Sequence, residues 1–434
     1  DLISSQQRKA AADTLKVRQA LTTIREQAQW LGASSLLAET LRAQVSKLPE
    51  MPKPQQLDGE MGELRVQRLH YEDLLGKQLQ YSSGSQDDGQ SLSAAQQKIL
   101  TAQLKTQTDL LNSLLSGCDT QILELTKLKV ANTQLVEALN EHNDAAHRYL
   151  FWVADVDPLS LTYPLQTMHD LNRLLSLDTL SQLGKALIMM VTSRETLLPL
   201  FGALILVIIS ISSRRHYYNF LDRASSRVGK VTQDQFSLTL RTLFWSILVA
   251  IPLPVLWAAL GYGLQSAWEY SIAVAIGDGV TATLPILWMF MISRYLAHPK
   301  GLFITHFGWP QPRVSRALRY YALSIWLIVP LIMALITFDN LNDREFSTTL
   351  GRLCFIVLCA LLSLVSHSLK RAGIPLYLDK QGNGSNVFNS ALWWMLLGAP
   401  LVAAMASMLG FLATSQALLA RLETSVAIWF LLLV

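Results

Sequence analysis

Seven long apolar stretches follow one another through the second half of this chain, and they limit its architecture more than any motif does. Each is close to the roughly 20 residues that a helix needs to cross about 30 Å of hydrocarbon. Backbone groups inside a bilayer have no water to bond, so apolar runs of this length form helices. We therefore predict seven transmembrane spans, at 197–213, 243–264, 271–292, 320–338, 350–369, 391–414 and 418–434.

The loops between these stretches alternate in charge, which predicts their orientation. The loops after the first, third and fifth spans are rich in arginine and lysine, and the other loops are poor in them. Under the positive-inside rule the basic loops are cytoplasmic, so residues 1–195 lie outside the inner membrane, in a periplasm. The two sets are Arg214, Arg215, Arg223, Arg227, Lys230, Arg241, Arg294, Lys300, Arg313, Arg316, Arg319, Lys370, Arg371 and Lys380, against Arg344, Arg352 and Arg421.

Composition excludes several other classes of protein. The mean hydropathy of +0.28 is moderate because a polar N-terminal third dilutes the apolar remainder. The net charge of +4 is small and its basic excess lies beside the membrane, so we expect no nucleic-acid partner. Three cysteines do not make a disulfide framework. The chain starts without Met in a helical pattern and ends in an apolar one, so we expect it to belong to a longer protein.

The first 160 residues predict an elongated helical domain. Helices are expected at 2–31, 35–46, 56–80 and 93–153, with a loop at 82–89 and an interruption considered at Gly117. Two readings of the last helix stay open, a coiled coil and an antiparallel hairpin packed within one subunit. Asn132 and His142 either set register or are plain polar interruptions. The seam that carries both readings is Leu125, Leu128, Asn132, Leu135, Leu139, His142, Ala146 and Tyr149.

Residues 161–195 form a connector with an amphipathic stretch just before the first span. Leu177, Leu180, Leu183, Leu187 and Val191 share one helical face in this stretch. Such a helix lies either at the membrane surface or in the core of the periplasmic domain, and the pattern alone does not decide between them. The predicted fold is all-α, with a periplasmic helical or coiled-coil domain at 1–160, this connector, and a membrane bundle at 196–434.

The membrane part contains a repeated helical hairpin. The pattern L-R-x4-S-I-x4-P-L occurs at 240–253 and again at 318–331, and Pro400-Leu401 lies at the corresponding depth in the sixth span. The return spans share Leu350-Gly351-Arg352-Leu353 and Leu419-Ala420-Arg421-Leu422. A proline removes one backbone hydrogen bond and permits a kink, so we expect hinges at Pro252, Pro330 and Pro400.

Candidates for chemistry are few. Asp278, between two glycines, is the acidic residue placed well inside a span, and an intramembrane carboxylate is a functional candidate by default. The alternative is that it caps or kinks its helix and meets water or an arginine. Arg421 and Glu423 can form an ion pair, with each other or with a neighbouring subunit. No nucleophile–base pair, metal-ligand spacing or nucleotide motif appears, so we expect no enzyme activity, no metal and no cofactor.

Several long runs resemble the miniconductance (MscM-type) mechanosensitive channels of the large MscS superfamily. They are VGKVTQD at 228–234, LRTLFWSILVA at 240–250, GLFITHFGWP at 301–310, DREF at 343–346 and LLARLETSVAIW at 418–429. The resemblance extends over essentially all of the chain. It implies an inner-membrane channel, assembled as a homo-heptamer among membrane lipids, that membrane tension opens to release ions and osmolytes.

One part of that family pattern is missing here. Family members line the pore with a final helix rich in glycine and alanine and follow it with a β-rich cytoplasmic vestibule, and neither pattern occurs in these 434 residues. No conduction residue is therefore transferred, and the chain is expected to supply the periplasmic part and the outer membrane hairpins. The competing readings are a transporter or lipid-handling protein that uses Asp278, and a structural scaffold.

Overall fold

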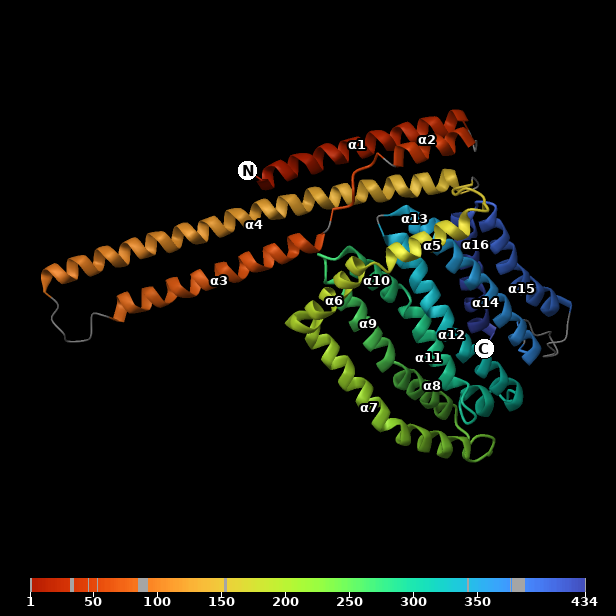
Figure 1. Ribbon diagram of the computed structural model, residues 1–434. Coiled ribbons are helices and arrows are strands. Elements are labelled where there is room, and N and C mark those ends of the chain that lie inside the picture. Colours follow the sequence, from red (N-terminus) through yellow and green to blue (C-terminus); the bar gives the residue numbers. More distant parts are fainter. Residues whose placement is uncertain are drawn as a thin grey trace. The chain divides into compact units, whose positions relative to one another are not determined.

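The protein is helical throughout the part that the structure describes. A computed structural model describes residues 2–31, 35–45, 47–52, 54–84, 93–151, 154–341, 343–374, 376 and 387–433, and no strand occurs among them (Figure 1). The chain divides into two compact units, Asp1–Val153 and Ala154–Val434. This boundary falls a few residues before the one predicted at 160, because residues 154–160 pack with the membrane helices.

The first unit is built along one long helix, α4 (Ala94–Leu150). Helix α1 (Leu2–Leu31) runs parallel to it, because Gln7 contacts Glu124 and Arg25 contacts Glu141. Helix α3 (Pro54–Gly84) runs antiparallel, because Asp58 pairs with Lys129 and Arg68 pairs with Asp119. A shorter helix, α2 (Ser35–Val45), packs back on α1 through Leu37, Leu41 and Ile24.

Most of the predicted seam of α4 is buried within a single chain. Leu125 and Leu128 pack on Leu57 and Met61 of α3, and Leu135 and Leu139 pack on Val17 of α1. The packing partners along this face are therefore an antiparallel helix and a parallel one, and a coiled coil between subunits stays a prediction. Gly117 does not interrupt α4, since a glycine inside a helix costs only about 1 kcal/mol. The predicted loop at 82–89 lies mostly outside the described residues, and α3 extends into its first part.

His142 is the one seam residue whose burial carries a chemical cost. Its side chain is 0% exposed, and neither ring nitrogen has a hydrogen-bond partner among the described residues. Removal from water disfavours the charged imidazolium, so burial lowers the pKa of His142 below its ordinary value of 6.5.

We expect this histidine to make the first unit sensitive to mild acid. Below about pH 6.5 this histidine binds a proton in the unfolded chain, whereas His142 in the folded protein stays neutral. The free energy of unfolding is therefore at its maximum above that pH and falls as the pH decreases. Between the two pKa values the loss is about 1.4 kcal/mol per pH unit. Hydrogen exchange of α1 and α4 between pH 7.5 and 5.5 measures it. His142→Leu should remove the loss, whereas the exposed-site control His70→Leu should not.

The second unit is a row of membrane helices that pack side by side in chain order. The first is α7 (Arg194–Ser225), and the rest form three hairpins. The first hairpin comprises α8 (Phe236–Ala250), α9 (Pro252–Gln265), α10 (Ser271–Ala282) and α11 (Leu284–Leu296). The second comprises α12 (Gln311–Asn340), α13 (Arg344–Phe346), η2 (Ser347–Gly351) and α14 (Arg352–Ala372), and the third α15 (Val387–Met408) and α16 (Leu412–Leu433). A π-helical turn, η1 (Leu302–His306), joins the first two hairpins.

Six of the seven predicted spans coincide with helices, single or paired, that are long and apolar enough to cross a membrane. The seventh, α16, is not among the six, although its two ends lie where a crossing helix would place them. The backbone N–H of Ala413 donates to Asp155 at one end of the second unit. Trp429 donates to the carbonyl of Leu376, just beyond the opposite end of α14. The seventh crossing stays a prediction that this geometry supports.

The structure alters the predicted limits of three spans. Spans two and three are each two helices, because Pro252 and Pro285 interrupt the backbone hydrogen bonding there. The two breaks are joined by a hydrogen bond of 3.0 Å from Trp257 to the hydroxyl of Thr283. The sixth span ends at Met408 and not at 414, since the chain turns at Gly410 with φ of +107°, a turn that no polar residue marks in the sequence.

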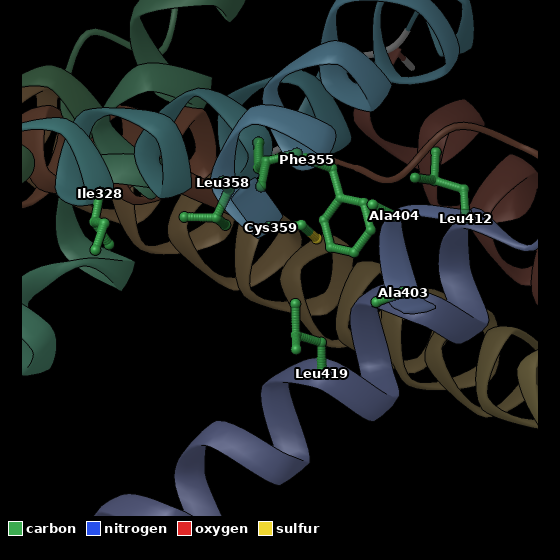
Figure 2. Packing of buried hydrophobic residues seen from close by; sticks show 9 residues of the cluster. Ile328, Phe355, Leu358, Cys359, Ala403, Ala404, Leu412 and Leu419 are labelled. Carbon is green, nitrogen blue, oxygen red and sulfur yellow. The ribbon is translucent and has the colours of Figure 1, made fainter. Parts of the chain in front are cut away.

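The second and third hairpins share one apolar core. Phe355, Leu358 and Cys359 of α14 face Ala403 and Ala404 of α15 (Figure 2). Ile328 and Leu335 from α12 and Leu412 and Leu419 from α16 complete the cluster. The outward sides of α7 and of these hairpin helices keep large apolar side chains exposed, as lipid contact requires, among them Phe201, Ile208, Trp326, Leu364 and Val402.

Alternate loops gather at the same end of this row. Asp222, in the last turn of α7, pairs with Lys300, after α11, and Thr239 of α8 hydrogen-bonds His306 of η1 at 2.9 Å. The first two basic loops therefore share one end of the row, as their predicted orientation requires. We call this the inner end and the opposite one the outer end.

Labelling with an impermeant thiol reagent tests which end faces outward. In a protein whose native cysteines are replaced by alanine, Ser266→Cys and Ser347→Cys should react from outside, and Ser226→Cys should react only after the membrane is opened. These positions follow α9, α13 and α7 respectively. If Ser226→Cys were the one variant of the three to be labelled in intact cells, the topology would be the inverse of the predicted one.

Candidate functional site

The segment before the first span is attached to all three hairpins at their outer ends. We call residues Ala154–Thr192 the outer strap. It contains α5 (Tyr163–Leu174) and α6 (Leu177–Thr192). Figure 1 shows it in yellow and yellow-green, leading into α7. The strap reaches the third hairpin first, then the second, then the first.

Backbone hydrogen bonds attach the strap to the third hairpin. The N–H groups of Asp155 and Val156 both donate to the carbonyl of Gly410, at 3.0 and 3.1 Å, and Leu159 donates to Met408 at 2.9 Å. The Asp155 carboxylate accepts from Ala413 at the start of α16, where unpaired backbone N–H groups favour a negative charge. A Cβ on Gly410 would lie 2.3 Å from the Val156 oxygen, so the strap needs glycine at this turn.

Arg352 attaches the strap to the second hairpin. It is the first residue of α14, and only 2% of it is exposed. Its guanidinium donates to the carbonyl of Asp157 at 2.8 Å and lies 5.8 Å from the ring centre of Tyr163. The Tyr163 hydroxyl in turn donates to the carbonyl of Thr349 at 2.6 Å. The strap therefore covers Arg352.

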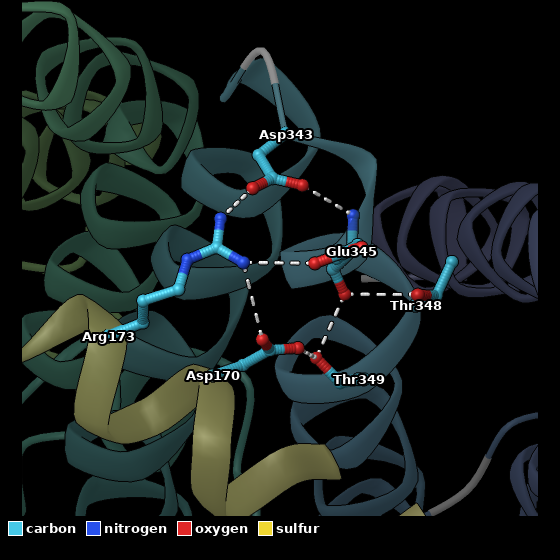
Figure 3. Close-up of polar contacts among 6 residues, drawn as sticks. All are labelled: Asp170, Arg173, Asp343, Glu345, Thr348 and Thr349. Atoms are coloured by element: carbon cyan, nitrogen blue, oxygen red, sulfur yellow. Dashed lines mark hydrogen bonds and ion pairs between the residues drawn. The ribbon is translucent and has the colours of Figure 1, made fainter.

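A charged cluster holds the C-terminal end of α5 to the loop between α12 and α14 (Figure 3). Arg173 pairs with Asp343 and, at 2.9 Å, with Glu345, while its guanidinium lies 4.8 Å from the ring centre of Phe346. Asp170, buried beneath it, lies 3.7 Å from Arg173 and accepts a hydrogen bond of 2.6 Å from Thr349. Three carboxylates thus converge on one guanidinium, which orients the loop between α12 and α14 against α5.

Helix α6 packs on the outer end of the first hairpin. Ala186 contacts Ala267 and Ala273, which flank the turn between α9 and α10, and Leu183 packs beside them. In the structure this helix belongs to the second unit. Its predicted apolar face is mostly open, since Leu177, Leu180 and Val191 are 51–86% exposed. The small side chain of Ala186 marks the packed face instead.

Asp278 is a packing residue of the first hairpin. Its carboxylate accepts a hydrogen bond of 2.8 Å from Gln265 in α9 and one of 3.4 Å from Asn340 in α12. The glycines on either side allow close helix contact, because a Cβ on Gly279 would lie 2.7 Å from the Met333 oxygen. The arrangement joins three helices through two side-chain amides.

The three candidate hinge prolines differ in their local helical structure. Pro252 begins α9 after a break, whereas α12 and α15 continue as single helices past Pro330 and Pro400. Bending at these positions under tension stays a prediction.

Arg421 and Glu423 are not paired with each other in the described part of the chain. They lie two residues apart, on different sides of α16. Arg421 is exposed, while one carboxylate oxygen of Glu423 is buried without a partner among the described residues. Arg421 is also the tenth residue of its helix, about 14 Å from its start, so it is not equivalent to Arg352. A pair with a neighbouring subunit stays a prediction.

Sequence reasoning missed most of the strap's contacts. Asp155, Asp170, Arg173 and Gly410 were not singled out, since their partners lie up to 258 residues away. The one available signal was the unusual density of charge in the short outer loop at 343–345, next to an apolar span.

Comparison with known proteins places this architecture in a family. The family model described as mechanosensitive ion channel inner membrane domain 1 matches residues 198–434, which hold α7 and all three hairpins. A curated relative, the miniconductance mechanosensitive channel MscM of Escherichia coli strain K12, is 68% identical over all 434 residues. The chain spans 39% of the length of that relative. The match includes the hairpin row and the outer turns that the strap holds, and the chain therefore belongs to the family of mechanosensitive ion channel inner membrane domains.

Proposed function

We propose that this chain is the periplasmic and tension-sensing membrane part of a channel that opens on hypo-osmotic shock and releases ions and osmolytes. The observation that carries the proposal is the row of hairpins. Each helix packs on its neighbours in the chain, and its outward side exposes large apolar residues to lipid. Such a row has a large lipid contact per subunit, which a tension sensor needs.

Many small tilting energies add up in the response to tension. Tension thins and widens a bilayer, and a helix responds to altered thickness by tilting, at fractions of a kcal/mol per Å of mismatch. Several helices per subunit, repeated around a ring of identical subunits, sum to enough to shift a two-state equilibrium. We propose a homo-heptamer, as the family resemblance implies, with membrane lipids as the other partner and residues 1–195 in the periplasm.

The relative's name describes a channel, which is a kind of protein that is not an enzyme. We propose the same for this chain. The alternative, a transporter that binds its substrate at Asp278, is disfavoured because both carboxylate oxygens accept hydrogen bonds from packed neighbouring helices.

Patch-clamp recording of the full-length protein in liposomes tests the proposal. We expect suction to open a conductance, and Asp278→Asn to keep it, because asparagine still accepts a hydrogen bond from Gln265. Pro252→Ala, Pro330→Ala and Pro400→Ala should shift the tension threshold, with the largest shift at the existing break. If the protein took up solute without any tension response, and Asp278→Asn abolished the uptake, the protein would be a transporter instead. If all three proline variants kept the wild-type tension threshold, the prediction that these prolines act as hinges would be wrong.

A further inference from the structure

Helix α5 of the strap has a large apolar surface that no part of the described chain covers. Leu161, just before the helix, is fully exposed, Leu165 is 74% exposed and Met168 is 70% exposed. Leu171 and Leu175 continue the same side at 44% and 58%. The spacing of four, three, three and four residues places them on one helical face. We call these five residues the apolar row.

The other two sides of α5 are occupied differently. One side is packed on the second hairpin through buried Thr167 and Asp170 and through Tyr163. A narrower third side carries the polar residues Gln166, His169 and Arg173, which are exposed. A helix with a packed side, an apolar side and a polar side fits the boundary between lipid and water.

The attachments of α5 show that it lies along the outer ends of the hairpins and does not cross the membrane. Its first residue, Tyr163, bonds Thr349, and its eleventh, Arg173, pairs with Asp343 and Glu345. Both ends of a helix about 18 Å long are therefore held by one short outer loop. Although α5 and α6 together are long and apolar enough for a span, they are bent by 44° at Leu175–Ser176.

We propose that the apolar row is a docking surface for phospholipid, inserted among the acyl chains of the outer leaflet. Two features favour lipid over a protein partner. Exposed apolar residues follow in chain order along α6, at Leu177, Leu180 and Ile188, and at the start of α7, at Leu198 and Phe201, which belong to a membrane span. The row also lies at the outer ends of the hairpins, where the spans end.

This surface gives the strap a role in regulation, a role that rests on the proposed function. Expansion of the outer leaflet acts on the apolar row, and the opposite face of α5 holds the turn between α12 and α14. The row thereby couples the packing of one leaflet to the hairpins.

Fluorescence quenching in liposomes tests the lipid contact. The full-length protein, with Cys118, Cys354 and Cys359 replaced by alanine, receives Leu165→Cys, Met168→Cys or, on the polar side, His169→Cys, each labelled with an environment-sensitive dye. We expect blue-shifted emission for the first two, with severalfold stronger quenching by lipids that carry a nitroxide near the headgroup than for the His169→Cys control. Equal access to a water-soluble quencher at all three sites would overturn the proposal. Blue-shifted emission without lipid quenching would overturn it too, because a protein would then cover the row.

A second measurement separates this inference from the proposed function. Leu165→Gln combined with Met168→Gln should shift the tension threshold, while His169→Gln should leave it unchanged. Lipid quenching without any tension-gated conductance would leave the docking surface in place and remove the channel function. A normal threshold in the double variant would remove the regulatory role.

Discussion

Replacing Gly410 by alanine is expected to release the strap from the third hairpin and to destabilise the membrane unit by about 3 kcal/mol. The φ of +107° belongs to a region that residues with a Cβ rarely adopt. The added carbon would also lie 2.3 Å from the backbone oxygen of Val156, which cannot move away without breaking the hydrogen bonds of Asp155 and Val156 to Gly410.

Thermal unfolding in detergent and hydrogen exchange in lipid nanodiscs measure this effect. The midpoint should fall, and the amides of Asp155, Val156 and Leu159 should lose protection first. Gly398→Ala is the matched control, since it lies within α15 with no atom within 4 Å of the added Cβ. It should be neutral or stabilising by up to about 1 kcal/mol. Equal midpoints for the two variants would show that the strap does not depend on this turn.

Replacing Arg352 by methionine is expected to cost about 2 kcal/mol, because a charged hydrogen bond to the Asp157 carbonyl is lost. Methionine matches the aliphatic part of the arginine side chain, so the change removes the charge and the donors while filling part of the space. The carboxylates of Asp155 and Asp157 also lose a nearby cation. The free energy of unfolding of Arg352→Lys should lie between those of the wild type and Arg352→Met, since lysine keeps the charge but loses the planar contact with Tyr163.

The same hydrogen-exchange experiment reads out this second variant. Protection should fall from Asp157 through Tyr163, while helices at the inner end keep theirs. Arg316→Met, an exposed site at the start of α12, provides the control for loss of one positive charge. If Arg352→Met left the strap fully protected, the backbone bonds to Gly410 and Met408 alone would hold it.

The membrane architecture was predictable because it depends on local quantities. Span length and loop charge can be counted along the chain, and the helices of the second unit appear where the apolar runs predicted them.

Other features depended on packing that no local pattern records. All three hinge candidates are prolines in apolar sequence, yet only Pro252 lies at a break. The start of α16 was misplaced because its turn is made by a glycine between apolar residues and is covered by backbone from the strap. The apolar face of α6 was identified, but its neighbour was left open, since periodicity shows that a face is apolar without showing what covers it.

The order in which the strap meets the hairpins has a consequence for biosynthesis. Asp155 leaves the ribosome 258 residues before its partner Ala413, which at ordinary elongation rates is about 10 to 50 s. During that interval the segment stays unattached, while α7 and the hairpins insert one after another. Its contact site at Gly410 and Ala413 exists only once the third hairpin has formed, so closure of this contact reports that all three hairpins have been inserted.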